Sequence, residues 1–365
     1  MDKLQTTLAE FLSNNDKNVP SNLLPEINHP CDEVDWSNIL NEYEDYIHIQ
    51  TFTNDLQAPP SDKVNVPPWF IASYSALPLG VNSVQSNLQD DDADNISDRD
   101  ESDNAPDSGK SPKLTGGIWS ITRGAAIGNA WHKLLEEADF QTGITLEETA
   151  RVMSMYNFKA PEQHQAAHQM FERLLDYRLP CGLQLKNLPR NARLNELEFL
   201  LDSPRGFRLS DLCAAGEDYM LSEFNHAPEG NGTFNMQGGF FTGFIDMVFV
   251  HNNKFYIVDW KSNSLDYDPA MFKPGNLKQR LFEKNYQMQY LCYTAALVRY
   301  LEQKLNCKFT AELYEHYFGE VYYIFLRGLT LEPAAGVFSA RPPFATVSAI
   351  ADVITCGKKE NNEND

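Results

Sequence analysis

The stretch "GFIDMVFVHNNKFYIVDWKSNS", residues 243–264, places the tightest constraint on the fold. Two apolar runs flank a short polar break, a pattern typical of two buried strands joined by a hairpin turn. Asn252 and Asn253 tolerate the positive φ angles that a two-residue hairpin turn prefers. The sequence therefore predicts a β-hairpin inside a sheet, although its strands carry two acids and a lysine.

The register of this hairpin brings the charged residues together. The turn pairs His251 with Lys254. The same register sets Asp246 directly opposite Asp259, with their Cβ atoms roughly 5 Å apart. Strand alternation puts Lys261 on the same face. Facing carboxylates in a buried sheet are unfavourable unless a cation lies between them, and a hard divalent cation such as Mg²⁺ suits oxygen ligands.

An ordinary ion pair is the alternative interpretation of these charges. Asp259 would then pair with Lys261, and Asp246 would pair with a basic group outside the hairpin. The D-x-K pattern on a strand does not decide between a metal site and an ion pair, so other elements of the chain have to be considered.

A histidine on a predicted helix is the first of these elements. His132 lies in "GAAIGNAWHKLLEE", with Gly124 and Gly128 on the same line of the helix. Glycines within a helix cost about 1 kcal/mol each relative to alanine, so this face is expected to approach a strand or a DNA backbone closely. A lone helical histidine is more often structural than a ligand.

Further polar residues lie on a strand and on a long helix. Glu196 and Glu198 share one face of the alternating strand "LNELEFLL". Gln289 and Tyr293 are four residues apart on a predicted helix and therefore share a face. Taken singly, exposed strand acids and a helical Gln–Tyr pair are both more often structural than functional.

The order of predicted elements indicates an α/β fold. Helices are expected at 125–138, 161–178, 285–305 and 342–356. Strands are expected at 69–77, 194–201 and 321–328, besides the hairpin. This order favours a mixed central sheet flanked by helices on its faces.

Charge and composition divide the chain further. Between Asp90 and Asp107 there are nine acids and one base, which accounts for −8 of the net charge of −21 and leaves −13 elsewhere. A tract so poor in apolar groups cannot offset the entropy of ordering, so it is expected to be disordered. The predicted organisation is a remnant of a preceding segment (1–66), a linker strand segment (67–84), an acidic disordered linker (85–115), a folded domain (116–357) and a disordered tail (358–365).

Several classes of protein are disfavoured by the sequence. No apolar run approaches the roughly 20 residues that a membrane span needs, and the N-terminus shows no secretory signal. The six cysteines form no CxxC pair, which favours free thiols in a reducing compartment such as the cytoplasm. The negative net charge argues against a nucleic-acid partner, but the acidic tract supplies much of it and a local basic surface is compatible with it.

Ordered blocks of the sequence resemble the nuclease domain of RecB. RecB is the beta subunit of exodeoxyribonuclease V, the RecBCD enzyme, and the resemblance places the chain in the PD-(D/E)XK nuclease superfamily. The blocks are "WFIASYSAL", "GNAWH", "GFIDMVF", "YIVDWKSN", "QYLCY", "HYFGEVYYIFLRG" and "GVFSARP". The D-x-K pattern alone is a weak signal, whereas the ordered set is specific and covers most of the chain.

The resemblance implies a restriction-endonuclease-like core and a set of site residues. It implies metal ligands for Mg²⁺ at His132, Asp246, Asp259, the Trp260 carbonyl and, as a further acid, Glu196. It implies catalytic positions at Asp246, Asp259, Lys261, Gln289 and Tyr293, of which Lys261 is the catalytic lysine and the last two form a supporting motif on the helix.

The resemblance also implies a function. It implies an Mg²⁺-dependent exodeoxyribonuclease V type enzyme that hydrolyses DNA phosphodiester bonds during double-strand-break repair and recombination. Single-stranded DNA, duplex ends, RecC, RecD and RecA are the expected partners, with no membrane. RecB proteins carry an ATP-driven helicase, which this sequence does not show, so the chain is expected to be the C-terminal part of a RecB.

Two other functions stay open at the level of the sequence. The first is a non-catalytic, nuclease-like module that binds partner subunits or DNA; such modules usually lose the acids or the lysine, and all are present here. The second is a metal-dependent hydrolase of another substrate, which no phosphate-binding loop or sugar-recognition motif favours.

Overall fold

The computed structural model describes residues 70–74, 77, 113–225, 235–236, 238–305 and 307–356. The predictions for 1–66, for most of 67–84 and of the acidic linker 85–115, and for the tail 358–365 lie outside these residues. Within the described part, no helix combines the length and the apolar character needed to cross a lipid bilayer.

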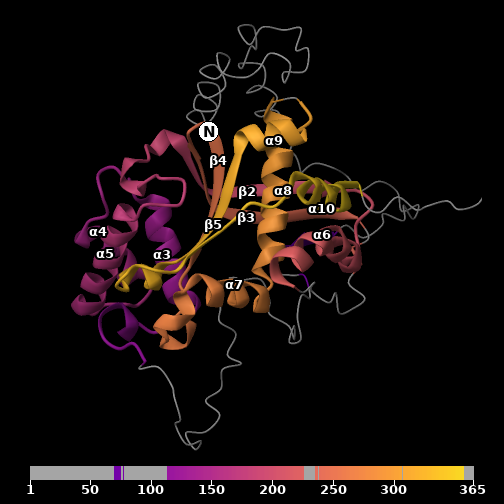
Figure 1. Cartoon of the computed structure of the whole chain (residues 1–365). Coiled ribbons are helices and arrows are strands. Elements are labelled where there is room, and N and C mark those ends of the chain that lie inside the picture. Colours follow the sequence, from indigo (N-terminus) through magenta and orange to yellow (C-terminus); the bar gives the residue numbers. More distant parts are fainter. Residues whose placement is uncertain are drawn as a thin grey trace, which may run out of the picture. The chain divides into compact units, whose positions relative to one another are not determined.

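A six-stranded mixed sheet forms the centre of the described fold (Figure 1). Its strands are β1 (Phe70–Ser73), β2 (Arg193–Ser203), β3 (Gly239–His251), β4 (Lys254–Lys261), β5 (Phe318–Phe325) and β6 (Val337–Ala340). The order is β1-β3-β4-β5-β6, with β2 also paired to β3. The β1–β3 and β4–β5 pairs are parallel and the others antiparallel. The prediction of a mixed sheet is therefore confirmed.

The predicted hairpin is present with the expected turn. Asn252 and Asn253 have φ angles of 49° and 63°, as a two-residue hairpin turn requires. His251 pairs with Lys254 in the expected register. The β4 strand is buried along almost its whole length, which explains why it reads as an unbroken apolar run apart from its charged residues.

The two strands of the hairpin separate before the end of β4. Their ladder runs from the turn to Met247 paired with Val258 and goes no further. Beyond this point β1 pairs with the start of β3, over Gly239–Thr242, while β4 continues beside β5. The sheet therefore forks, and residues 243–246 of β3 lie at the opening between β1 and β4.

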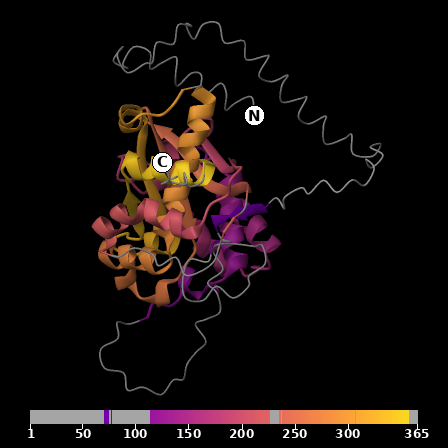
Figure 2. The same ribbon diagram turned by 90° about the vertical axis from the view of Figure 1, so that its right-hand side faces the viewer.

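Helices cover both faces of the sheet (Figure 1). One layer consists of α3 (Ala125–Glu137), α4 (Leu146–Met155) and α5 (Pro161–Asp176). The other contains α6 (Leu209–Phe224), α8 (Tyr286–Leu305) and α10 (Phe344–Cys356). The closing helix α10 packs on α6 and α8, which are distant in sequence (Figure 2). This arrangement confirms the prediction of a mixed sheet flanked by helices.

The remaining helices are shorter and connect these layers. The α-helices among them are α7 (Pro274–Glu283) and α9 (Ala311–Tyr317). The 3-10 helices are η3 (Gly117–Ser120), η4 (Leu185–Asn187), η5 (Arg190–Ala192), η6 (Leu265–Tyr267), η7 (Pro269–Phe272) and η8 (Leu326–Thr330).

The hydrophobic core below α3, α4 and α5 includes one face of the hairpin. Trp131 and Leu134 of α3 are buried in it together with Met247, Val258 and Trp260. Because side chains alternate along a strand, Asp259 and Lys261 point to the opposite face, toward α8. Packing in this core therefore fixes the position of α3 over the sheet, and with it the position of His132.

Three sequence predictions need correction. The strand predicted at 69–77 is shorter, because β1 ends at Ser73. The strand predicted at 321–328 begins three residues earlier, at Phe318, and ends at Phe325, where η8 takes over. Gly124 is not inside the helix: it is the N-cap residue of α3, with a φ angle of 124° that suits glycine. The free-energy cost of a glycine inside a helix, which the sequence pattern assigned to both glycines, therefore applies only to Gly128.

Candidate metal centre

A distorted position joins β2 and β3 at the fork of the sheet. The two strands pair at Asn195 and Met247, skip one residue in each strand, and then pair again. Glu196 and Asp246 are left facing each other at this gap. Glu196 has a φ angle of 50°, a left-handed conformation that costs a non-glycine residue about 1 kcal/mol or more. Strain of this kind persists where the surrounding structure holds it, and it is frequent at functional sites.

Helix α3 brings an imidazole to the same place. His132 follows the fully buried Trp131, so the packing of that indole sets the direction of the imidazole. The Nδ1 atom of His132 lies 3.6 Å from Oδ1 of Asp246. Its Nε2 atom lies 3.0 Å from the carbonyl oxygen of Trp260. Since a carbonyl only accepts hydrogen bonds, Nε2 is the nitrogen that carries the hydrogen in this contact.

The backbone of Trp260 explains why these side chains meet at the fork. Where β4 leaves β3, the peptide groups of Trp260 lose the partners that a continued ladder would supply. Its N–H donates to Oδ2 of Asp246 at 2.7 Å, and its carbonyl accepts from His132. Buried backbone groups without a partner are costly, so Asp246 and His132 stabilise the fork by replacing the missing ladder bonds.

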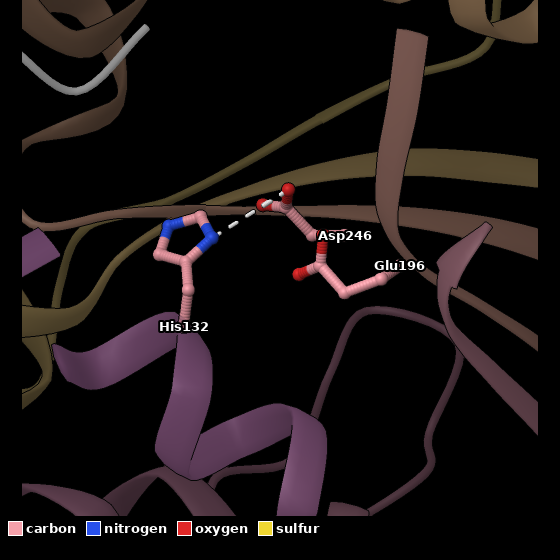
Figure 3. Close-up of side chains that lie close together, drawn as sticks. All are labelled: His132, Glu196 and Asp246. Carbon is pink, nitrogen blue, oxygen red and sulfur yellow. Dashed lines mark ion pairs between the residues drawn. The ribbon is translucent and has the colours of Figure 1, made fainter. Parts of the chain in front are cut away.

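His132, Glu196 and Asp246 form a compact group of potential metal ligands (Figure 3). Each offers one ligand atom, and these atoms all lie within 4.8 Å of one another. The pKa of Asp246 is raised to about 6, chiefly by burial and in part by Glu196, while His132 and Lys261 oppose the rise. Burial also raises the pKa of Glu196. Both carboxyls thus resist ionisation together, which a cation between them would reverse.

The donor set fits a divalent cation. Two carboxylates and one imidazole supply hard oxygen ligands and one borderline nitrogen, a combination that divalent metals accept. The neutral imidazole with hydrogen on Nε2 presents a lone pair at Nδ1, on the side of Asp246. The group can therefore hold a metal ion without a change of tautomer.

Asp259 lies beside this group and is engaged with the lysine. Its Oδ1 atom is 2.7 Å from Nζ of Lys261, and both side chains are almost completely buried. The ammonium group also lies 4.3 Å from the ring centroid of Tyr286 in α8. The ion pair that the sequence offered as an alternative is thus present for Asp259, whereas Asp246 faces His132 rather than an outside base.

The expected pairing of Asp246 with Asp259 differs from the structure. The β3–β4 ladder ends one residue pair before it, because β1 takes over the edge of β3 and β4 diverges. Glu196, not Asp259, is the acid grouped with Asp246 and His132. The Trp260 carbonyl, expected to be a metal ligand, accepts from His132 instead.

Gln289 and Tyr293 lie in a buried network on α8. The Nε2 atom of Gln289 donates to the Tyr293 hydroxyl at 3.2 Å, and its Oε1 atom accepts from the Tyr323 hydroxyl at 2.7 Å. Tyr323 is the β5 partner of Asp259, and its ring lies 5.4 Å from Nζ of Lys261. These two residues therefore act on the lysine environment through Tyr323 and stand outside the group of potential metal ligands.

One residue near the site was not identified from the sequence. Arg327 is fully buried, and its guanidinium donates to the carbonyl oxygens of Ser262, Ile118 and Ile121. It also lies 4.9 Å from the ring of Trp131. Arg327 thereby ties the segment after Lys261 to the segment before α3. A charged residue within the apolar run "VYYIFLRG" was the available signal.

Comparisons with known proteins bear on this geometry. No protein-family model matches the chain. The RecBCD enzyme subunit RecB of Haemophilus influenzae is 29% identical over 244 residues, 65% of this chain. RecB of Escherichia coli is 28% identical over 309 residues, 83% of the chain. RecB of Mycobacterium tuberculosis is 26% identical over 293 residues, 70% of the chain. The chain is thus similar to RecB over most of its length.

The expected resemblance to RecB is therefore confirmed. These matches cover 19%, 24% and 26% of the three RecB subunits, so the chain spans about a quarter of their length or less. The proportions agree with the expectation that it corresponds to one part of RecB.

Proposed function

We propose that the chain is an Mg²⁺-dependent DNA nuclease of the RecB type, built on a PD-(D/E)XK core. The observation that carries the proposal is the group formed by His132, Glu196 and Asp246 at the fork, with the buried Asp259–Lys261 pair beside it. The similarity to RecB and the mixed sheet flanked by helices support the same proposal.

The residues at the fork have distinct tasks in this proposal. His132, Glu196 and Asp246 hold the metal ion, which when bound polarises a phosphate and lowers the pKa of a water ligand. Lys261 offsets negative charge that develops on the phosphate. Asp259 keeps Lys261 charged and oriented through the 2.7 Å ion pair. Asp259 and the Trp260 carbonyl are the additional ligands of this proposal.

The aromatic surroundings of Lys261 support its task. Nζ lies near the rings of Tyr286 and Tyr323, whose negative faces favour an ammonium group. Gln289 holds the Tyr323 hydroxyl in place through a hydrogen bond, and Tyr293 in turn accepts a hydrogen bond from Gln289. In this proposal, their contribution to catalysis is to position Lys261 rather than to contact the metal.

Partners follow from the similarity to RecB. The relatives are named as subunits of the RecBCD enzyme, so DNA and the RecC and RecD subunits are the partners that we propose, in the bacterial cytoplasm. The comparisons name no RecA, and the expectation of that partner gains no support from them.

The decisive test is digestion of linear single-stranded DNA by the purified chain with Mg²⁺ and with EDTA. Cleavage is expected with Mg²⁺ and not with EDTA. Glu196→Gln should reduce it strongly, whereas Glu198→Gln, an exposed acid two residues along β2, should not. Loss of cleavage in both variants alike would contradict the assigned site. Metal-induced stabilisation without any cleavage would instead favour the non-catalytic module.

A further inference from the structure

A pocket lies beyond the end of β4, where the junction of α7 and α8 meets the segment before α3. It encloses about 310 Å³ of space, including solvent at its open mouth. Besides the acid Asp266, its polar lining is supplied by Arg123, Asn263, Ser264, Arg280, Lys284 and Tyr286. These residues come from separate parts of the chain, and none of the six belongs to the group of potential metal ligands.

The pocket concentrates positive charge in an acidic protein. Arg123, Arg280 and Lys284 line it, against one acid, Asp266. Arg280 also pairs with Glu283 at 3.3 Å, so part of its charge is offset, whereas the side chain of Lys284 is exposed. Because the chain as a whole carries a net charge of −21, such a grouping marks a local site for anions.

The start of α8 adds to this positive potential. Tyr286 is the first residue of α8 and lines the pocket, and the helix runs for 20 residues. The N-terminus of a helix carries a partial positive charge and unsatisfied N–H groups, which favour phosphate. Ser264 and Asn263, both buried, place short polar side chains on the opposite wall.

The walls of the pocket are held by buried interactions. Arg327 donates to the carbonyl oxygen of Ser262, the residue before Asn263 in one wall. It also donates to the carbonyl oxygen of Ile121, two residues before Arg123 in the other wall. The lining then continues into η6, whose three residues all have φ angles between 45° and 59°. A guanidinium at the base thus fixes the spacing between walls that are about 140 residues apart in sequence.

An aromatic ring connects the pocket with the proposed catalytic lysine. Tyr286 lines the pocket, and its ring centroid lies 4.3 Å from Nζ of Lys261. Lys261 is in turn paired with Asp259 at the fork. A strand whose phosphate reaches Lys261 therefore has the pocket within reach of its next phosphates.

We propose that this pocket binds a backbone phosphate of the nucleic-acid strand, next to the phosphate that the metal ion holds. The inference rests on the proposed nuclease function and adds a subsite to it. Arg123, Arg280 and Lys284 contact the phosphate oxygens, and Asn263 and Ser264 donate to them. The contacts are to the backbone, so the subsite fixes the position of the strand without reading its sequence.

The test measures binding of a labelled single-stranded oligonucleotide in EDTA, where no metal-dependent cleavage occurs, over a series of salt concentrations. Lys284→Ala and Arg123→Ala are each expected to reduce the slope of log K against log salt by about 0.7, the value for one phosphate contact on a single strand. The double variant should weaken binding by roughly tenfold at low salt. Thermal melts confirm that each variant folds.

A matched control removes one positive charge elsewhere. Lys308 is exposed and lies beyond the other end of α8, about 30 Å along the helix from Lys284. Lys308→Ala should leave the affinity and the salt slope unchanged. Equal effects of Lys308→Ala and Lys284→Ala on affinity and salt slope would mean that only the net charge of the protein matters, and would overturn the subsite.

The outcomes separate this inference from the proposed function. If the wild type cuts DNA and Lys284→Ala binds like the wild type, the subsite is wrong and the nuclease stands. If the wild type does not cut but the variants lose affinity as expected, the subsite stands alone. If the wild type neither binds nor cuts, both fail. Inorganic phosphate at matched ionic strength should displace the strand from the wild type more readily than from Lys284→Ala, because the two anions compete for the pocket. Phosphate that binds the wild type without weakening strand binding would assign the pocket to free phosphate and overturn the strand subsite.

Discussion

Replacing Asp246 by asparagine should stabilise the metal-free protein at neutral pH, even though the residue is proposed to hold the metal. Asparagine has nearly the shape of aspartate, and its amide oxygen can accept the Trp260 N–H that Oδ2 accepts at 2.7 Å. Its NH₂ group can donate to Nδ1 of His132, where Oδ1 now lies at 3.6 Å. The change therefore removes a buried negative charge while it keeps the bonds that close the fork.

The magnitude follows from the pKa of Asp246. Burial, opposed in part by His132, raises this pKa from its ordinary 3.8 to about 6. A rise of about two pH units corresponds to about 3 kcal/mol of lost stability when the group is ionised. The side chain keeps 13% exposure, and asparagine gives up a charge-assisted hydrogen bond, so the expected gain is about 1 to 2 kcal/mol.

The pH dependence has a defined sign. The pKa is higher in the folded than in the unfolded chain, so the folded state binds more protons between about pH 4 and pH 6. Stability of the wild type contributed by this group is therefore lost as the pH rises through that window. Asparagine does not titrate, so the advantage of Asp246→Asn should be near zero at pH 4 and complete above pH 7.

The assay is thermal or denaturant unfolding in EDTA at pH 5 and pH 7.5. The variant should melt several degrees higher than the wild type at pH 7.5, with a smaller difference at pH 5. Asp202→Asn, at an exposed acid on β2, should show no such difference. Addition of Mg²⁺ should stabilise the wild type and leave the variant unchanged. A variant less stable than the wild type at pH 7.5 in EDTA would refute the reasoning.

Two further substitutions test other parts of the site. Asp259→Ala should abolish cleavage and destabilise the protein by roughly 3 kcal/mol, because it leaves Lys261 buried without its acid. Adding Lys261→Met to this variant should restore most of the stability but not the activity. Unfolding curves of the single and the double variant check the two stability changes. Glu196→Gly should stabilise the metal-free protein by about 1 kcal/mol, since it removes both a left-handed strain and a half-buried acid. Glu198→Gly should lower stability by a similar amount, and the opposite order would show that Glu196 is not strained.

Local signals in the sequence were sufficient for much of the fold. The two asparagines specified the hairpin turn and its register. Apolar periodicity located α3, α5, α8 and α10 to within a few residues. Other helices had usable signals that the periodicity did not reveal. Helix α4, for example, begins with a capping box in which Thr145 and Glu148 satisfy each other's backbone groups, visible in the sequence as "TLEE".

The geometry of the site was less accessible because it depends on distant contacts. Asp246 does not pair with Asp259 because β1, more than 160 residues earlier, occupies the edge of β3 that β4 leaves. Strand alternation predicted the face of Lys261, yet it could not predict where the ladder ends. The roles of His132 and Glu196 came from the resemblance to RecB, since neither a helical histidine nor a strand acid is specific by itself.

The fork of the sheet determines how a metal ion can enter without disturbing the fold. The N–H group of Trp260 is bonded to Oδ2 of Asp246, and its carbonyl is bonded to Nε2 of His132. A metal ion that took Oδ2 and Nε2 as its ligands would leave these buried backbone groups without partners, at a cost of about 1 to 3 kcal/mol each. The other atoms, Nδ1 of His132 and Oδ1 of Asp246, face each other at 3.6 Å. A cation that binds there, with Glu196 as its third ligand, keeps the fork closed and relieves the repulsion between the two acids. The side chains that replace the missing ladder are thus the same side chains that we propose as metal ligands, with one atom of each bonded to the backbone of Trp260 and the other facing the proposed cation.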